Sequence, residues 1–123
     1  MSRTSVQMLS KDTAGTSITL PFTGASVTSS NVPADSYYGF SDGLHTVGIT
    51  LSGFTGSIAI EGTLAKTPGA NDWFRIQLGG QNAVPFTTHT GTTAYTFTGN
   101  YLYVRALVFG RSAGSVTSIL LNH

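Results

Sequence analysis

The chain has 123 residues, a length typical of one domain with its own hydrophobic core. Only 9% of the residues are charged, six basic against five acidic, and cysteine is absent. These figures exclude a disulfide framework, a thiolate metal site and a cysteine nucleophile. The net charge of +1 gives no electrostatic sign of a nucleic-acid partner, and no apolar run or signal peptide predicts a membrane partner or secretion.

Threonine, serine and glycine replace most of the missing charged residues. A free monomer normally stays soluble through Asp, Glu and Lys on its surface. A surface coated with hydroxyl groups therefore favours a domain that packs against neighbouring subunits. A neutral secreted domain is the alternative.

Alternation of apolar and polar residues with a period of two dominates the chain, which predicts strands rather than helices. Seven strands are expected, at residues 17–22, 44–51, 57–64, 73–78, 93–98, 101–109 and 115–121, with weaker ones near 6–8, 25–28 and 37–40. This spacing predicts an all-β fold, an antiparallel β-sandwich of jelly-roll type. We expect a single domain over residues 1–123, with an N-terminal arm of about residues 1–16.

Glycine-rich turns separate several of these predicted strands. Gly53 and Gly56 flank Phe54, which predicts a tight hairpin between 44–51 and 57–64. Gly114 is expected to begin the last strand. In the polar connector over residues 66–72, Asp72 is expected to accept a hydrogen bond from a nearby backbone N–H.

The alternation also predicts which side chains face the core. The expected core residues are Ile18, Leu20, Phe22, Val47, Ile49, Leu51, Ile58, Ile60, Leu64, Phe74, Ile76, Leu78, Leu102, Val104, Ala106 and Val108. Phe74 is expected to anchor its strand in the core, while Trp73 lies on the opposite face.

Residues that could carry catalysis are few. The chain has no Gly-x-Ser-x-Gly motif, and its five acidic residues show no pairing that indicates glycoside hydrolysis. Glu61 is the only acid within the seven expected strands, and its outward position indicates an ion pair with Arg75 or Arg105. The three histidines have no metal-ligand spacing. We therefore expect no enzymatic activity, no metal and no cofactor.

Aromatic residues are the main binding feature. Trp73, Tyr101 and Tyr103 occupy the non-core phase of their predicted strands, and Arg105 follows in the same phase. Tyr37 and Tyr38 lie together in a polar segment. Such residues are enriched in protein interfaces, and exposed aromatic rings also stack on sugars. Both interpretations, a subunit interface and a carbohydrate site, stay open.

The pattern over residues 44–121 resembles small β-sandwich structural proteins, or modules, of tailed bacteriophage virions. It consists of the segments 56–65, Pro68, 71–74, 99–106 and 114–119. In these proteins an Ile-x-Ile-Glu-Gly-Thr-Leu strand leads through a loop to Asp-Trp-Phe. A Tyr-x-Arg-Ala strand then precedes a glycine-led closing strand.

The resemblance implies a non-enzymatic virion protein, made in the host cytoplasm and located in the virion. We expect a capsid decoration or cement protein, with a tail, neck or fibre component as the alternative. Its partners would be other copies of itself and other virion proteins of the capsid or tail. A carbohydrate-binding module that recognises a host surface glycan is the competing hypothesis. The residues 2–11, Trp73 and Tyr103 are the expected subunit contacts.

Overall fold

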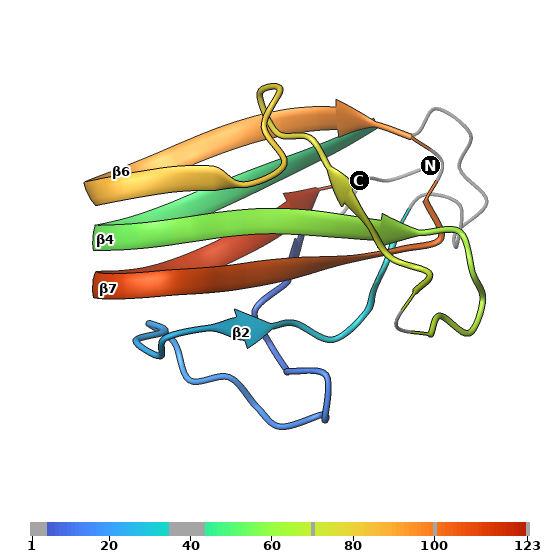
Figure 1. The fold of residues 1–123 in the computed structure, drawn as a ribbon, viewed down its shortest axis with the longest axis horizontal. Coiled ribbons are helices and arrows are strands. Elements are labelled where there is room, and N and C mark those ends of the chain that lie inside the picture. The colour runs from blue at the N-terminus through green and yellow to red at the C-terminus, as the bar shows by residue number, and fades with distance from the viewer. Residues whose placement is uncertain (1–4, 35–43, 70, 100, 123) are drawn as a thin grey trace.

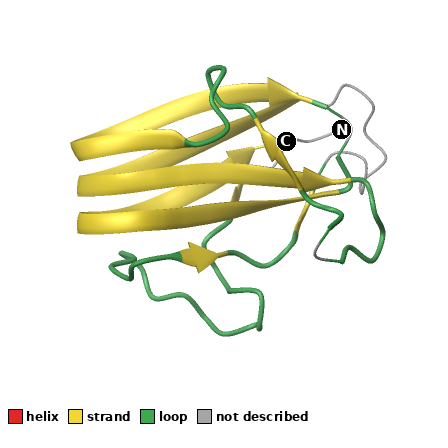
Figure 2. Cartoon of the chain, viewed as in Figure 1, coloured by secondary structure: helices red, strands yellow, loops and turns green. Residues whose placement is uncertain are grey.

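A computed structural model describes residues 5–34, 44–69, 71–99 and 101–122. These residues form strands and loops and contain no helix, as Figure 2 shows. The strands are β1 (Ser5–Gln7), β2 (Val27–Thr28), β3 (Val32–Pro33), β4 (Leu44–Thr63), β5 (Phe74–Ile76), β6 (Val84–Thr98) and β7 (Tyr103–Asn122). The predicted all-β class is confirmed.

All seven strands belong to one hydrogen-bonded sheet, and every pairing is antiparallel. The central strand is β4, which pairs with β7 on one side and with β6 and β5 on the other. The short strands β1, β2 and β3 pair with the outer side of β7. The connection from β6 to β7 therefore passes across β4 instead of forming a hairpin.

The three long strands curl over, so that the sheet is a half-barrel. Figure 1 shows β4, β6 and β7 each doubling back at the left, with the two halves of each strand on opposite sides of the core. The register of β4 shifts between Leu51 and Gly56 against β6 and between Thr50 and Ser57 against β7. Gly53 in β4 and Gly114 in β7 have positive φ angles of 58° and 73° in this region, a conformation that glycine adopts at no steric cost.

The predicted boundaries near these glycines are wrong. Gly53 and Gly56 lie inside one continuous strand, β4, and Gly114 lies inside β7. Residues 17–22 form no strand and contribute two isolated bridges, from Ser17 to Lys11 and from Phe22 to Val116. A glycine pair permits a bend within a strand as readily as a turn between two strands, and alternation alone does not distinguish them. The two-sheet jelly-roll sandwich stays a prediction.

The core lies inside the curl. It is formed by Met8, Leu9, Val32, Ala34, Val47, Ile49, Leu51, Phe54, Ile58, Ile60, Ile76, Leu78, Val84, Phe86, Phe97, Val104, Ala106, Val108, Val116, Ile119 and Leu121. Most of the core positions expected from alternation in the long strands are therefore confirmed. Two are wrong, because the side chains of Phe74 and Leu64 are 43% and 69% exposed. Phe74 begins the three-residue strand β5 and Leu64 follows the last residue of β4, so both stand at the rim of the curl.

The described part of the expected N-terminal arm lies against the sheet. β1 pairs with the last residues of β7, and the Met8 N–H donates a hydrogen bond of 2.8 Å to the Ile119 carbonyl. Met8 and Leu9 are buried in the core. Since this segment contributes to the core, we expect truncation before Leu9 to destabilise the fold.

Candidate functional site

A row of charged side chains crosses the outer face of the sheet. In the strand register, Glu61 of β4 lies opposite Arg75 of β5 on one side and opposite Arg105 of β7 on the other. The Arg75 Nε donates to Glu61 Oε2 at 3.2 Å, and the Arg105 Nε donates to Glu61 Oε1 at 2.9 Å. The Arg105 Nη2 lies 2.8 Å from the same Oε1. The sequence predicted one of these ion pairs, and the structure contains both.

Two aromatic rings extend this row. The guanidinium carbon of Arg105 lies 4.2 Å from the ring centre of Trp73, and that of Arg75 lies 5.4 Å from the ring centre of Phe109. Both distances fit cation–π contacts, which stabilise more strongly where the groups are shielded from water. We call these five residues, Trp73, Arg105, Glu61, Arg75 and Phe109, the Trp–Arg platform.

The loop before β5 holds Trp73 in place. Within this loop the Gly69 N–H donates a hydrogen bond of 2.7 Å to Asp72 Oδ2. The Asp72 N–H donates to the Gly69 carbonyl at 3.2 Å. The predicted role of Asp72 is thereby confirmed, and the loop is closed directly beside Trp73.

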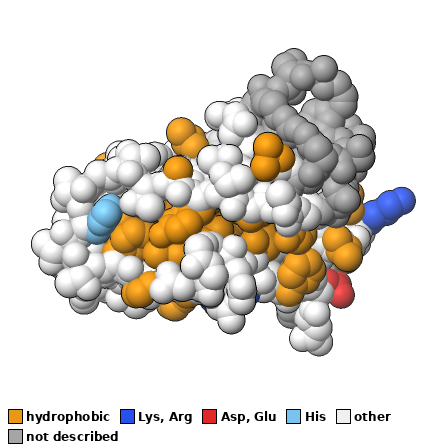
Figure 3. Space-filling view, turned by 90° about the horizontal axis from the view of Figure 1, so that it is seen from above, with side chains coloured by type: hydrophobic (Ala, Val, Ile, Leu, Met, Phe, Trp, Pro, Cys, Tyr) orange, Lys and Arg blue, Asp and Glu red, His pale blue; other side chains and the backbone are white. Residues whose placement is uncertain are grey.

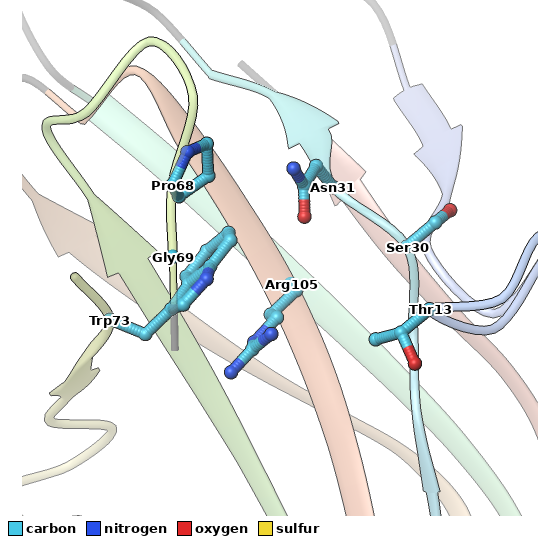
Figure 4. A pocket seen from close by; sticks show the side chains of 7 residues that line it. All are labelled: Thr13, Ser30, Asn31, Pro68, Gly69, Trp73 and Arg105. Atoms are coloured by element: carbon cyan, nitrogen blue, oxygen red, sulfur yellow. The ribbon is translucent and has the colours of Figure 1, made fainter. Parts of the chain in front are cut away.

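A pocket of about 510 Å³ opens beside the platform. Its lining residues are Thr13, Ser30, Asn31, Pro68, Gly69, Trp73 and Arg105. Figure 4 shows Pro68, Gly69 and Trp73 on one side, Asn31, Ser30 and Thr13 on the other, and Arg105 between them. Hydroxyl, amide, indole and guanidinium groups in one pocket can bind a polar ligand such as a sugar, or a polar segment of another protein.

The platform offers binding groups and no general base. Each carboxylate oxygen of Glu61 already accepts a hydrogen bond from an arginine. With both oxygens engaged by guanidinium N–H donors, the Glu61 carboxylate is not free to accept a proton from a substrate. Within the described residues no group of three or more His, Asp or Glu side chains could hold a metal ion.

Tyr101, another predicted binding residue, belongs to a separate aromatic cluster. The ring centre of Tyr101 lies 5.9 Å from that of His45, 5.7 Å from that of Phe74 and 6.1 Å from that of Phe97. Burial in this cluster raises the pKa of the Tyr101 hydroxyl above its ordinary value. Tyr103 is half-buried in β7 opposite Thr63. Tyr37 and Tyr38 lie outside the described residues.

Part of the site was not predicted from the sequence. Thr13, Ser30 and Asn31 come from the N-terminal segment, whose backbone runs along the outer edge of β7 near Arg105. The sequence does not show which strand an isolated polar residue in a loop will lie against. Phe109 alternates in phase with Arg105, and that spacing could have identified it.

Comparisons with known proteins assign no family, since no protein-family model and no curated protein match the chain. None of the described segments forms a helix with the length and apolar character needed to cross a membrane. The features of this chain that bear on its function are therefore the platform, the pocket and the distribution of charge.

Proposed function

We propose that this chain is a non-enzymatic structural protein of a tailed-bacteriophage virion, acting as a capsid decoration or cement protein. The observation that carries the proposal is the Trp–Arg platform, in which Trp, Arg and Phe side chains lie in cation–π contact on the outer face of the sheet. These residue types dominate the binding energy of protein interfaces. The resemblance of residues 44–121 to virion modules supports a location in the virion. The proposal also includes a jelly-roll sandwich as the more detailed description of the curled sheet.

The low charge supports assembly in many copies. Particle symmetry repeats each small contact many times, so modest interfaces add up to firm attachment. With 9% charged residues, neighbouring copies can approach with little repulsion. A location in the tail, neck or fibre stays the alternative within this class.

Co-sedimentation of the purified chain with capsids and with tails of the encoding phage tests the proposal. We expect binding to capsids that Trp73→Ala weakens about 30-fold, the effect of losing a roughly 2 kcal/mol hot-spot residue. Phe74→Ala is the matched control, because its 43% exposed side chain lies next in the chain but outside the platform. Binding to tails alone would change the location, and binding to neither particle would contradict the proposal.

A carbohydrate-binding module is the second candidate, and the pocket between Trp73 and Asn31 favours it. Calorimetric titration with glycans of the host surface tests it directly. Binding that Trp73→Ala and Asn31→Ala both abolish would support a glycan site. If the chain attaches to capsids but binds no glycan, the structural role remains and the carbohydrate-binding hypothesis is wrong.

A further inference from the structure

The outer edge of β6 has no strand partner in the described part of the chain. β6 pairs with β4 only, and residues 92–98 form its straight second half, opposite residues 44–50 of β4. An unpaired edge offers a row of backbone N–H and C=O groups to another strand. Proteins usually protect such an edge with charges, prolines, bulges or very short strands.

This half of β6 carries none of those protections. Residues 92–98 read Thr-Thr-Ala-Tyr-Thr-Phe-Thr, and no charged residue occurs between Arg75 and Arg105 in the whole chain. The opposite edge of the sheet differs, since β1, β2 and β3 contain only three, two and two residues. Lys11 and Asp12 also lie in the segment that follows β1. One edge is therefore blunted and the other is left open.

The core residues of β6 are covered less completely than those of β4 and β7. Figure 3 looks onto the molecule from the β6 side and shows a band of hydrophobic side chains between two polar rims. The inward side chains of β6 keep some exposure, 8% for Phe86 and 6% for Phe97, whereas Ile49 of β4 and Ile119 of β7 are fully buried. Tyr95, between them in β6, is half-buried. A second strand along β6 would cover this band as well as the backbone edge.

We propose that residues 92–98 of β6 pair antiparallel with the same residues of a second copy of this chain. The two-fold axis lies midway between the Tyr95 residues of the two copies, at the centre of the segment, so that all seven residues find partners. Self-pairing fits because an antiparallel two-fold contact is self-complementary and an uncharged segment places no like charges opposite each other. The proposal extends the proposed function, because a virion subunit that binds its own copies needs such a contact.

Lysines on this strand test the contact. Ala94 and Thr96 are exposed and share the outer face of β6, and this two-fold axis sets residue 94 of one copy opposite residue 96 of the other. We expect the full chain to sediment as a dimer and the A94K/T96K variant as a monomer with unchanged circular dichroism. The A94E/T96K variant places Glu opposite Lys and should restore the dimer.

The matched control is S52K/T117K, which adds two lysines at exposed positions on β4 and β7, away from the open edge. It should remain dimeric. Hydrogen exchange gives a second readout. Those backbone amides of residues 92–98 that point away from β4 should be protected in the wild-type dimer and exchange in A94K/T96K, whereas the amides bonded to β4 stay protected in both.

A monomeric wild-type chain would overturn the proposal, and so would a dimer that A94K/T96K leaves intact. If the wild type is monomeric but A94K/T96K loses capsid binding, the edge takes a strand from another virion protein instead. If the wild type is a dimer but A94E/T96K stays monomeric, the pairing of residue 94 with residue 96 about an axis at Tyr95 is wrong. A β6 dimer that binds neither capsids nor tails would remove the proposed function and leave this contact standing.

Discussion

Glu61 illustrates how one residue organises the functional surface. Its side chain is 13% exposed and lies between arginines that are 35% and 19% exposed. The carboxylate fixes both guanidinium groups, and each guanidinium then contacts one aromatic ring. Two arginines share the single carboxylate of Glu61, so the three residues together have a formal charge of +1. This charge can attract a negatively charged ligand or partner.

Glu61→Gln should therefore destabilise the fold and disturb Trp73. The variant leaves two arginines without a counter-charge at a half-buried position, and we expect a loss of about 1–3 kcal/mol in the free energy of unfolding. Urea unfolding measures this loss, and the fluorescence of Trp73, the single tryptophan, reports the release of Arg105. Lys66→Gln removes an exposed charge and should change stability by less than about 0.5 kcal/mol. Equal stabilities of the two variants would contradict the structural role of Glu61.

Tyr101 gives a pH-dependent prediction. Its pKa is raised from 10.0 by burial, so the folded state holds the hydroxyl proton more tightly than the unfolded state does. The contribution to stability is complete below pH 10 and decreases as the pH rises through the folded-state pKa. Tyr101→Phe lacks this proton, and its stability should fall less steeply than that of the wild type above pH 10. Parallel profiles in alkaline urea titrations would show that Tyr101 ionises freely in the fold.

At the same scale, the sequence predicts the platform only in part. Trp73, Glu61 and Arg105 could be predicted as surface residues. Each is polar or aromatic, and the alternation places each on the face of its strand that points away from the core. Tyr101 has the same signal and lies elsewhere, because it precedes the first residue of β7 and alternation does not extend to it. The prediction that Phe74 lies in the core is wrong for a similar reason, since the strand that contains it is only three residues long.

At the scale of elements, composition predicts strands but not where they bend. Residues in β4 and β7 alternate correctly on both sides of the bends, so the core positions follow from the sequence. The bends themselves depend on how neighbouring strands meet. Gly114 of β7 lies against the backbone of Gly53 in β4, and the Arg111 Nε donates a hydrogen bond of 2.6 Å to the Gly114 carbonyl. Such a contact between distant residues leaves no local pattern.

Gly114→Ala should disrupt this bend. A Cβ at Gly114 would collide with the Gly53 carbonyl and the Phe54 nitrogen, and its φ of 73° is unfavourable for alanine. We expect a loss of about 3 kcal/mol or more in the free energy of unfolding. Gly110→Ala is the control, because Gly110 has a similar φ of 66° but open space around it. That variant should lose only about 1–2 kcal/mol, and equal losses in thermal unfolding would mean that the close approach is unimportant.

At the scale of the whole molecule, the charge distribution separates two surfaces. The Trp–Arg platform holds three of the eleven charged residues, whereas residues 76–104, which include all of β6, hold none. The chain thus presents a charged, aromatic surface on the outer face of the sheet and an uncharged edge along β6. The sequence shows the gap in charge directly, but only the strand order shows that the gap coincides with an open edge.

The two surfaces should respond differently to salt. From about 0.01 M to about 1 M salt the Debye length falls from roughly 30 to 3 Å, which weakens contacts between exposed charges. The β6 dimer should keep its dissociation constant over this range, because its contact contains no charged side chain and rests on backbone hydrogen bonds and apolar burial. Binding through Arg105 should weaken over the same range. Sedimentation equilibrium at both salt concentrations measures the first, and capsid co-sedimentation of the wild-type chain measures the second. A dimer that dissociates as salt rises would show that charged residues outside β6 hold it, and the assignment of the contact to β6 would be wrong.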